Sequence, residues 1–190
     1  MVMQTNGRVA VTGRFIMIFI RFVAAFAMLL SASCIGSAQG SKLTDPQIAH
    51  VAYTAGQLDI EAAQQALQKS NNKEVIAFAQ NMERDHKAVN DQALALVKKL
   101  NVAPEDNDTS KALTKQAADK RAELAKLSGA AFDKAYIDND VAYHKAVNGA
   151  LQNTLIPSAT NQELKDLLTP GLKILQGHEQ HAEHVAAELK

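Results

Sequence analysis

Histidine and acidic residues recur inside the apolar faces of the helices that this sequence predicts. Around residues 75–100, apolar side chains recur with the spacing of one helix face, and Asp85 and His86 fall inside that face. A buried polar group without a partner costs a few kcal/mol. We therefore expect other helices to supply partners for this acid and this imidazole.

Each of the other long helical segments offers polar side chains near its own midpoint. Asp140 and His144 stand four residues apart, which places them on the same side of a helix. In an antiparallel bundle the midpoints of the helices share one level, so the polar residues would meet there. The candidate ligands of a metal ion in this layer are Asp59, Glu61, Asp85, His86, Asp140, His144, His178 and Glu179.

Imidazoles and carboxylates gathered in this way are the ligand types that transition metals prefer. Iron, zinc and manganese are the ions that we consider. Hydrogen bonds between Asp and His across the bundle would also satisfy both partners without any metal, and would then serve only helix packing. A di-iron redox centre is a further alternative. The sequence contains no Gly-rich phosphate-binding motif and no motif of a Ser or Cys nucleophile. It therefore does not indicate an enzyme.

The elements that position these side chains are all helical. The first helix opens at Asp45 behind the capping residue Thr44, and a break at residues 70–72 separates it from the second. A shorter third helix, capped by Thr109 or Ser110, follows a loop. The spacing predicts two more long helices, over 132–154 and from about 161, and Pro170-Gly171 should kink or interrupt the last one. We therefore expect an all-α, up-down four-helix bundle with one extra short helix.

The N-terminus has the three parts of a secretory signal. Three arginines precede a short apolar run at residues 22–30, and small residues lead to Ala38, after which we expect cleavage. Lipidation of Cys34 is an alternative, and Met17 is an alternative start. The expected parts are a signal peptide at 1–38, a linker at 39–44 and the helical bundle at 45–189. The mature chain would be exported to the periplasm or the outer membrane.

Composition excludes several classes of function. The chain has 190 residues, is 47% hydrophobic and 21% charged, and has no formal net charge. No basic patch suggests nucleic acid, and no stretch of the mature chain is apolar enough to span a bilayer. An envelope protein remains an expected kind of partner. Tyr53, Tyr136 and Tyr143 are expected to be core and rim aromatics and not redox groups.

Two motifs resemble a known family. They are Phe78-Ala-Gln-Asn-Met-Glu-Arg-Asp-His86-Lys-Ala-Val-Asn90, and Phe132-Asp-Lys-Ala-Tyr136 followed by Val141-Ala-Tyr-His144. The chain is similar in these motifs to a bacterial family of exported helical proteins, a domain of unknown function often labelled a predicted outer-membrane protein. The resemblance implies a ferritin-like bundle, a signal peptide and an envelope location, with recurrent polar positions at Asp85, His86, Asn90, His144 and His178 and an acid at Asp59 or Glu61. It implies no established activity.

Overall fold

The computed structural model describes residues 42–189, so the predicted signal peptide lies outside the described residues. None of the described helices combines the length and the hydrophobicity that a membrane span requires. The elements, in chain order, are α1 (Asp45–Lys69), α2 (Lys73–Lys99), α3 (Asp108–Ala125), α4 (Gly129–Ala150), the π-helical turn η1 (Leu151–Leu155), α5 (Ile156–Ser158) and α6 (Gln162–Glu188).

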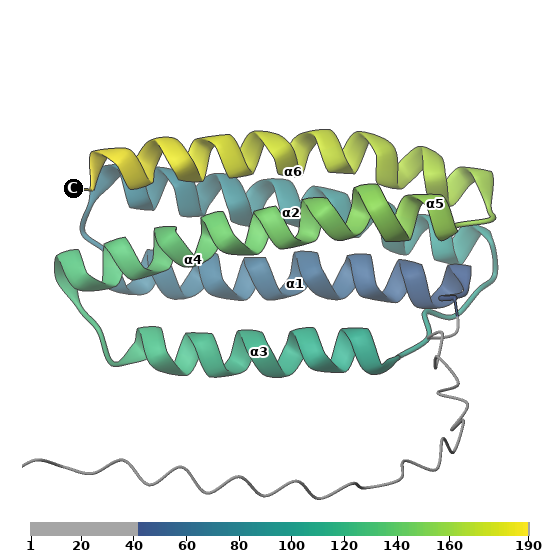
Figure 1. Cartoon of the computed structure of the whole chain (residues 1–190), viewed down its shortest axis with the longest axis horizontal. Helices are drawn as coiled ribbons and strands as arrows, with labels where there is room; N and C mark the ends of the chain where they lie inside the picture. The colour runs from purple at the N-terminus through teal and green to yellow at the C-terminus, as the bar shows by residue number, and fades with distance from the viewer. Residues whose placement is uncertain (1–41, 190) are drawn as a thin grey trace, which may run out of the picture. The chain divides into compact units, whose positions relative to one another are not determined.

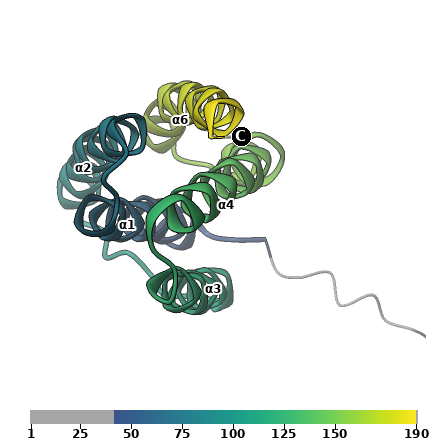
Figure 2. The ribbon, with the colours of Figure 1, turned by 90° about the vertical axis from the view of Figure 1, so that its left-hand side faces the viewer.

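Helices α1, α2, α4 and α6 surround one interior, which confirms the predicted all-α bundle (Figures 1 and 2). Helix α1 packs against α2, and α4 packs against α6. Helix α3 lies outside these four, beside α1, and connects two helices that run in the same direction (Figure 1). One long crossover of this kind is also a feature of ferritin-like bundles. The ferritin-like description itself stays a prediction.

The helix ends follow the capping chemistry of the sequence, with two differences. Thr44 caps α1 as predicted, but the cap of α3 is Asn107, whose side chain accepts the backbone N–H of Ser110 at 3.1 Å. The predicted cap at Thr109 or Ser110 was therefore wrong, because the side chain of Asn107 already accepts a backbone N–H group of the first turn of α3. Helix α6 also runs through Pro170 without interruption, and Pro170 is exposed to solvent.

Two apolar clusters fill the bundle, one towards each end. The first includes Phe78, Met82 and Phe132, and the second includes Ile48, Leu155 and Leu168. On each of the four bundle helices, at least one buried polar residue lies between the parts that contribute to the two clusters. The core is therefore divided by a polar layer near the middle of the bundle.

The carboxylate of Asp45 joins the start of α1 to the start of α6. It accepts the backbone N–H of Thr160 at 2.7 Å and that of Asn161 at 2.9 Å. We expect Asp45→Ala to lower the free energy of unfolding by about 1–2 kcal/mol, because both N–H groups lose a charged acceptor. Urea titration measures this loss. Asp138→Ala, which removes only a surface pair with Lys134, is the control and should cost at most about 0.5 kcal/mol. Equal losses in the two variants would contradict the prediction.

Candidate metal centre

The polar layer brings together five of the predicted residues from four helices. Each of the five side chains is buried, with at most 6% of the residue exposed. They are Asp59 from α1, His86 from α2, Asp140 and His144 from α4, and His178 from α6. We call these five residues the polar cluster.

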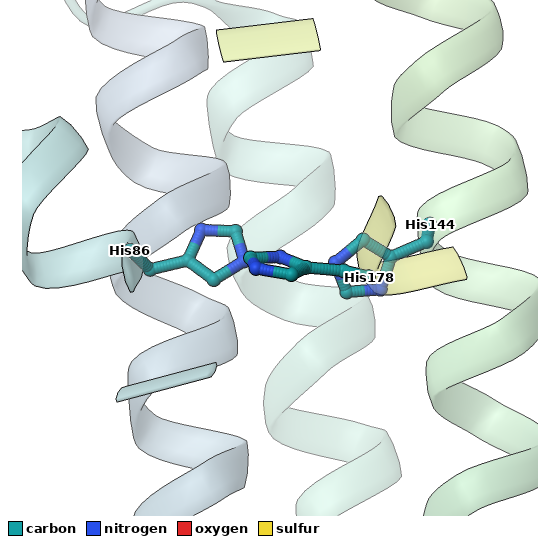
Figure 3. Close-up of side chains that lie close together, drawn as sticks. All are labelled: His86, His144 and His178. Carbon is teal, nitrogen blue, oxygen red and sulfur yellow. The ribbon is translucent and has the colours of Figure 1, made fainter. Parts of the chain in front are cut away.

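The three imidazole rings of the polar cluster face one another (Figure 3). The ring centroids of His86 and His178 are 5.1 Å apart, those of His144 and His178 are 5.4 Å apart, and those of His86 and His144 are 5.7 Å apart. One ring nitrogen from each histidine lies within 4.8 Å of those from the other two. This spacing is compatible with three ligands around one small cation.

Each of the three rings also has one buried nitrogen without a hydrogen-bond partner. These atoms are Nε2 of His86, Nε2 of His144 and Nδ1 of His178. Buried polar atoms are normally paired, so three orphaned nitrogens in one cluster need an explanation. A neutral imidazole uses such a free nitrogen to bind a metal ion.

The opposite nitrogens of two rings are hydrogen-bonded, and this fixes the orientation of the rings. The Nε2–H group of His178 donates to Oδ2 of Asp85 at 3.1 Å, and the Nδ1–H group of His144 donates to the backbone oxygen of Asp140 at 3.1 Å. Asp85 is held in turn by the guanidinium of Arg84, at 2.7 Å. Histidines that bind metals have outer partners of this kind, which leave the ligating nitrogen free.

Two carboxylates complete the polar cluster. Oδ2 of Asp59 lies 2.8 Å from Nε2 of His86, and Oδ1 of Asp140 lies 2.8 Å from Nδ1 of His144. At these distances the charge of each imidazole acts directly on its carboxylate. Two ligands of one tetrahedral zinc ion, each about 2.1 Å from it, are themselves about 3.4 Å apart. The Asp59–His86 contact is shorter than this and has the length of an ordinary carboxylate–imidazole pair.

Three predicted ligands lie outside the polar cluster. Glu61 pairs with the guanidinium of Arg121 at 2.7 Å, and Glu179 accepts a hydrogen bond from the side-chain amide of Asn148 at 2.7 Å. Asp85 lies at the edge, where its side chain is 30% exposed and contacts His178 instead of the cluster centre. Asp85 therefore lies at the rim of the polar cluster, in contact with His178.

Sequence reasoning missed one polar group near the cluster. Tyr136 is fully buried, and it stands four residues before Asp140 on the same side of α4. The four-residue spacing that places Asp140 and His144 on one side of the helix also places Tyr136 there, so the sequence could have indicated it.

Burial and neighbouring charges shift the pKa values of the acids in opposite directions. Burial and the negative charge of Asp59 raise the pKa of Asp140 to about 6. Burial alone would also raise the pKa of Asp59, but the adjacent imidazole of His86 outweighs it and lowers this pKa below its usual value.

The histidines are also separated in pKa. Burial alone would lower the pKa of His144, but the contact with Asp140 and the charge of Asp59 raise it to about 9. Burial lowers the pKa of His178 to about 4, against the opposing effect of Asp85. These shifts favour a protonated His144 and a neutral His178 at neutral pH.

A cavity of about 520 Å³ reaches the polar cluster from the side of α3. Its walls are mostly apolar and come from α1, α2, α3, α4, η1 and α6, and Asp59 and His86 form part of its lining. Small solutes in this cavity therefore have direct access to two of the five cluster residues.

The raised pKa of His144 makes the stability of the metal-free protein depend on pH. The protonated form is favoured by the fold, so its contribution is complete below about pH 6.5 and is lost as the pH rises towards 9. We expect the free energy of unfolding, measured with a chelator present, to fall over this range by at most about 3 kcal/mol. His144→Gln should remove most of this slope. An identical slope in the variant would contradict the assignment to His144.

Solved structures share this fold at low sequence identity. One of them is the crystal structure of a DUF305 protein from Streptomyces coelicolor, which is described as a secreted protein. Its TM-score is 0.65 at 12% sequence identity, and the match covers 76% of this chain and 93% of that one. CopM in its Cu(II)-bound form has a TM-score of 0.57 at 18% identity, covering 77% of this chain and 98% of that one. At these identities the two likenesses establish the fold alone.

The sequence itself gives the family. No curated protein matches the chain. A family of bacterial helical proteins was expected from the two motifs, and the comparison with known families confirms a domain of unknown function. The match extends over residues 31–185, and the chain therefore belongs to the family described as domain of unknown function DUF4142.

Proposed function

We propose that this protein binds one divalent transition-metal ion in the polar cluster. The proposal rests on one observation: three buried imidazole rings from three different helices each offer a nitrogen within 4.8 Å of the other two, and the carboxylate of Asp59 lies beside one of them. His86, His144 and His178 would be the nitrogen ligands, and Asp59 would supply an oxygen. Asp140 and Asp85 would act as outer partners that orient His144 and His178.

The donor set favours Cu(II) or Zn(II) among the divalent ions. Imidazole suits copper, zinc and iron, and manganese prefers sites richer in oxygen. The five cluster residues contain no sulfur, which Cu(I) would prefer. CopM, a structure with the same fold, is known in a Cu(II)-bound form, and this supports Cu(II) as the first ion to test.

The donor set is a poorer match for a di-iron redox centre. Ferritin-like di-iron sites combine a glutamate from each of two helices with a Glu-x-x-His motif from each of the other two. Here the converging carboxylates are Asp59 and Asp140, while Glu61 and Glu179 pair elsewhere. We therefore propose a binding protein, and not an oxygen-activating enzyme.

Export of the protein is part of the proposal. The predicted signal peptide supports it, and so does the description of the DUF305 protein as secreted. We propose a location in the cell envelope, and an outer-membrane association stays a prediction.

Loss of one ring should abolish tight metal binding. After loading with Cu(II) and dialysis, we expect the purified protein to retain about one ion per chain, and His144→Gln and His178→Gln to bind at least ~10-fold more weakly. His184→Gln is the matched control, because that side chain is 70% exposed on the same helix as His178. Elemental analysis and calorimetric titration give the stoichiometry and the affinity.

The opposite result would favour a structural role for the polar layer. In that case the wild-type protein retains no stoichiometric Cu(II) or Zn(II). His144→Gln then lowers only the free energy of unfolding, by about 1–3 kcal/mol, as expected for a lost buried hydrogen bond.

Metal binding should release a proton. His144 is protonated at neutral pH, and its Nε2 can bind an ion only after the ring becomes neutral. We therefore expect the Cu(II) affinity to fall by up to about tenfold for each pH unit below 9. Calorimetry in two buffers with different ionisation enthalpies measures the released proton. An affinity that is constant between pH 6 and 8 would contradict this prediction.

A further inference from the structure

The cavity beside α3 is larger than metal binding requires. Its volume of about 520 Å³ lies within the range of pockets that hold small organic molecules, about 300–1,000 Å³. Asp59 and His86 are the residues of its lining that belong to the polar cluster. Most of the remaining lining is apolar, so one metal ion does not account for most of this space.

Small side chains on α4 and the position of α3 create the cavity. Ala142, Ala146 and Ala150 follow one another at intervals of four residues, which places them on one side of α4, and all three line the cavity. Helix α3 packs mainly against α1, and within α3 only Ser110 and Leu124 are buried. Because α3 does not close over the three alanines, this side of α4 faces an open space and not a close-packed interface.

The charged residues of the lining lie towards one end of the cavity. Helices α1 and α3 run in the same direction, since the side-chain amide of Asn107 donates to the backbone oxygen of Gln47 at 3.3 Å near the start of both helices. Further along, the guanidinium of Arg121 pairs with Glu61 at 2.7 Å. Glu61 closely follows Asp59 along α1, so Arg121 stands near the level of the polar cluster.

The other end of the cavity is apolar. There Val51, Leu151 and Leu155 line it and belong to the second apolar cluster, against which Leu113 of α3 packs. From Val51 to Glu61, helix α1 rises by about 15 Å at 1.5 Å per residue. A cavity with one charged end and one apolar end fits a chain-like molecule that carries a single polar group.

Arg121 supplies a hydrogen-bond donor at the charged end. Its Nη2 atom pairs with Glu61, but its Nη1 atom is buried and has no hydrogen-bond partner among residues 42–189. A guanidinium donates and never accepts, so the matching group of a ligand is an acceptor, and a carboxylate makes the strongest such contact. A cationic group would instead meet the positive charges of Lys120 and Arg121. The acid of the lining, Asp59, already contacts the imidazole of His86.

We propose that this cavity binds a monocarboxylate with one aliphatic chain. The carboxylate accepts hydrogen bonds from the guanidinium of Arg121, and the chain lies along the alanines of α4 towards Leu151 and Leu155. Each methylene group that leaves water strengthens binding by up to about fourfold. The binding involves no covalent step, and it does not depend on the proposed metal ion.

Calorimetric titration of the metal-free protein with decanoate, below the concentration at which micelles form, tests this assignment. We expect hexanoate to bind at least ~10-fold more weakly than decanoate, because it buries fewer methylene groups. Arg121→Gln should weaken decanoate binding at least ~10-fold, as for a lost hydrogen bond to a charged group, and should not weaken the binding of decanol. Lys115→Gln is the matched control, because its side chain is 77% exposed on the same helix and lies outside the lining.

A second variant tests the place of the chain. Ala146 is exposed to solvent, so the fold accommodates a larger side chain there, and a phenyl ring at this position fills part of the cavity. We expect Ala146→Phe to weaken the binding of both decanoate and decanol at least ~10-fold, because fewer methylene groups can be buried. Circular dichroism checks the fold of each variant.

Several results would overturn the proposal. One is the absence of decanoate binding to the wild-type protein, and another is equal decanoate affinity of Arg121→Gln and Lys115→Gln. Tighter binding of decylamine than of decanoate would exclude the assigned head group. Unchanged decanoate binding in Ala146→Phe would place the chain outside this cavity. A chelator is present in all these titrations, so none of the results bears on the proposed metal binding.

Discussion

The burial of several ionisable side chains at one level of a helical bundle is the constraint on which this structure depends. Carboxylates and imidazoles lose their hydration there, and their mutual contacts must replace it. Asp59 and Asp140 lie beside His86 and His144, and the apolar clusters on both sides exclude water from the contacts. The helices must therefore keep one register, because a shift by a single turn would separate Asp59 from His86 and Asp85 from His178.

The contacts within the polar cluster leave some of its buried polar atoms without hydrogen-bond partners. The acids balance the charge of the imidazoles, and Oδ2 of Asp59 lies 2.8 Å from Nε2 of His86, but Nε2 of His144 and Nδ1 of His178 have no hydrogen-bond partner among the described residues. A purely structural polar layer would be expected to pair these atoms, since an unpaired buried group costs free energy and gains nothing. The family is a domain of unknown function, so the incomplete pairing is the most informative property of the site.

The sequence predicted the bundle and most of the cluster for the same reason. A polar residue inside an otherwise apolar helical stripe is visible without a structure, and this identified Asp59, His86 and His178. The helical periodicity does not separate residues that are only one or two positions apart in the sequence. Glu61 and Glu179 lie on helices of the cluster but are rotated away from its centre, where Arg121 and Asn148 satisfy them. Tyr136 was missed because an aromatic residue in an apolar stripe is ordinarily core, and only its place four residues before Asp140 connects it with the cluster.

Helix α3 contributes no residue to the polar cluster, although it forms one wall of the cavity that leads there. Within this helix only Ser110 and Leu124 are buried, so separating it from α1 exposes little apolar surface. Such an element is expected to open locally at a much smaller free-energy cost than unfolding of the four-helix core. The four-helix core would then stay folded while α3 moves away from it. The rate at which a ligand enters or leaves the cavity would depend on the motion of this one helix.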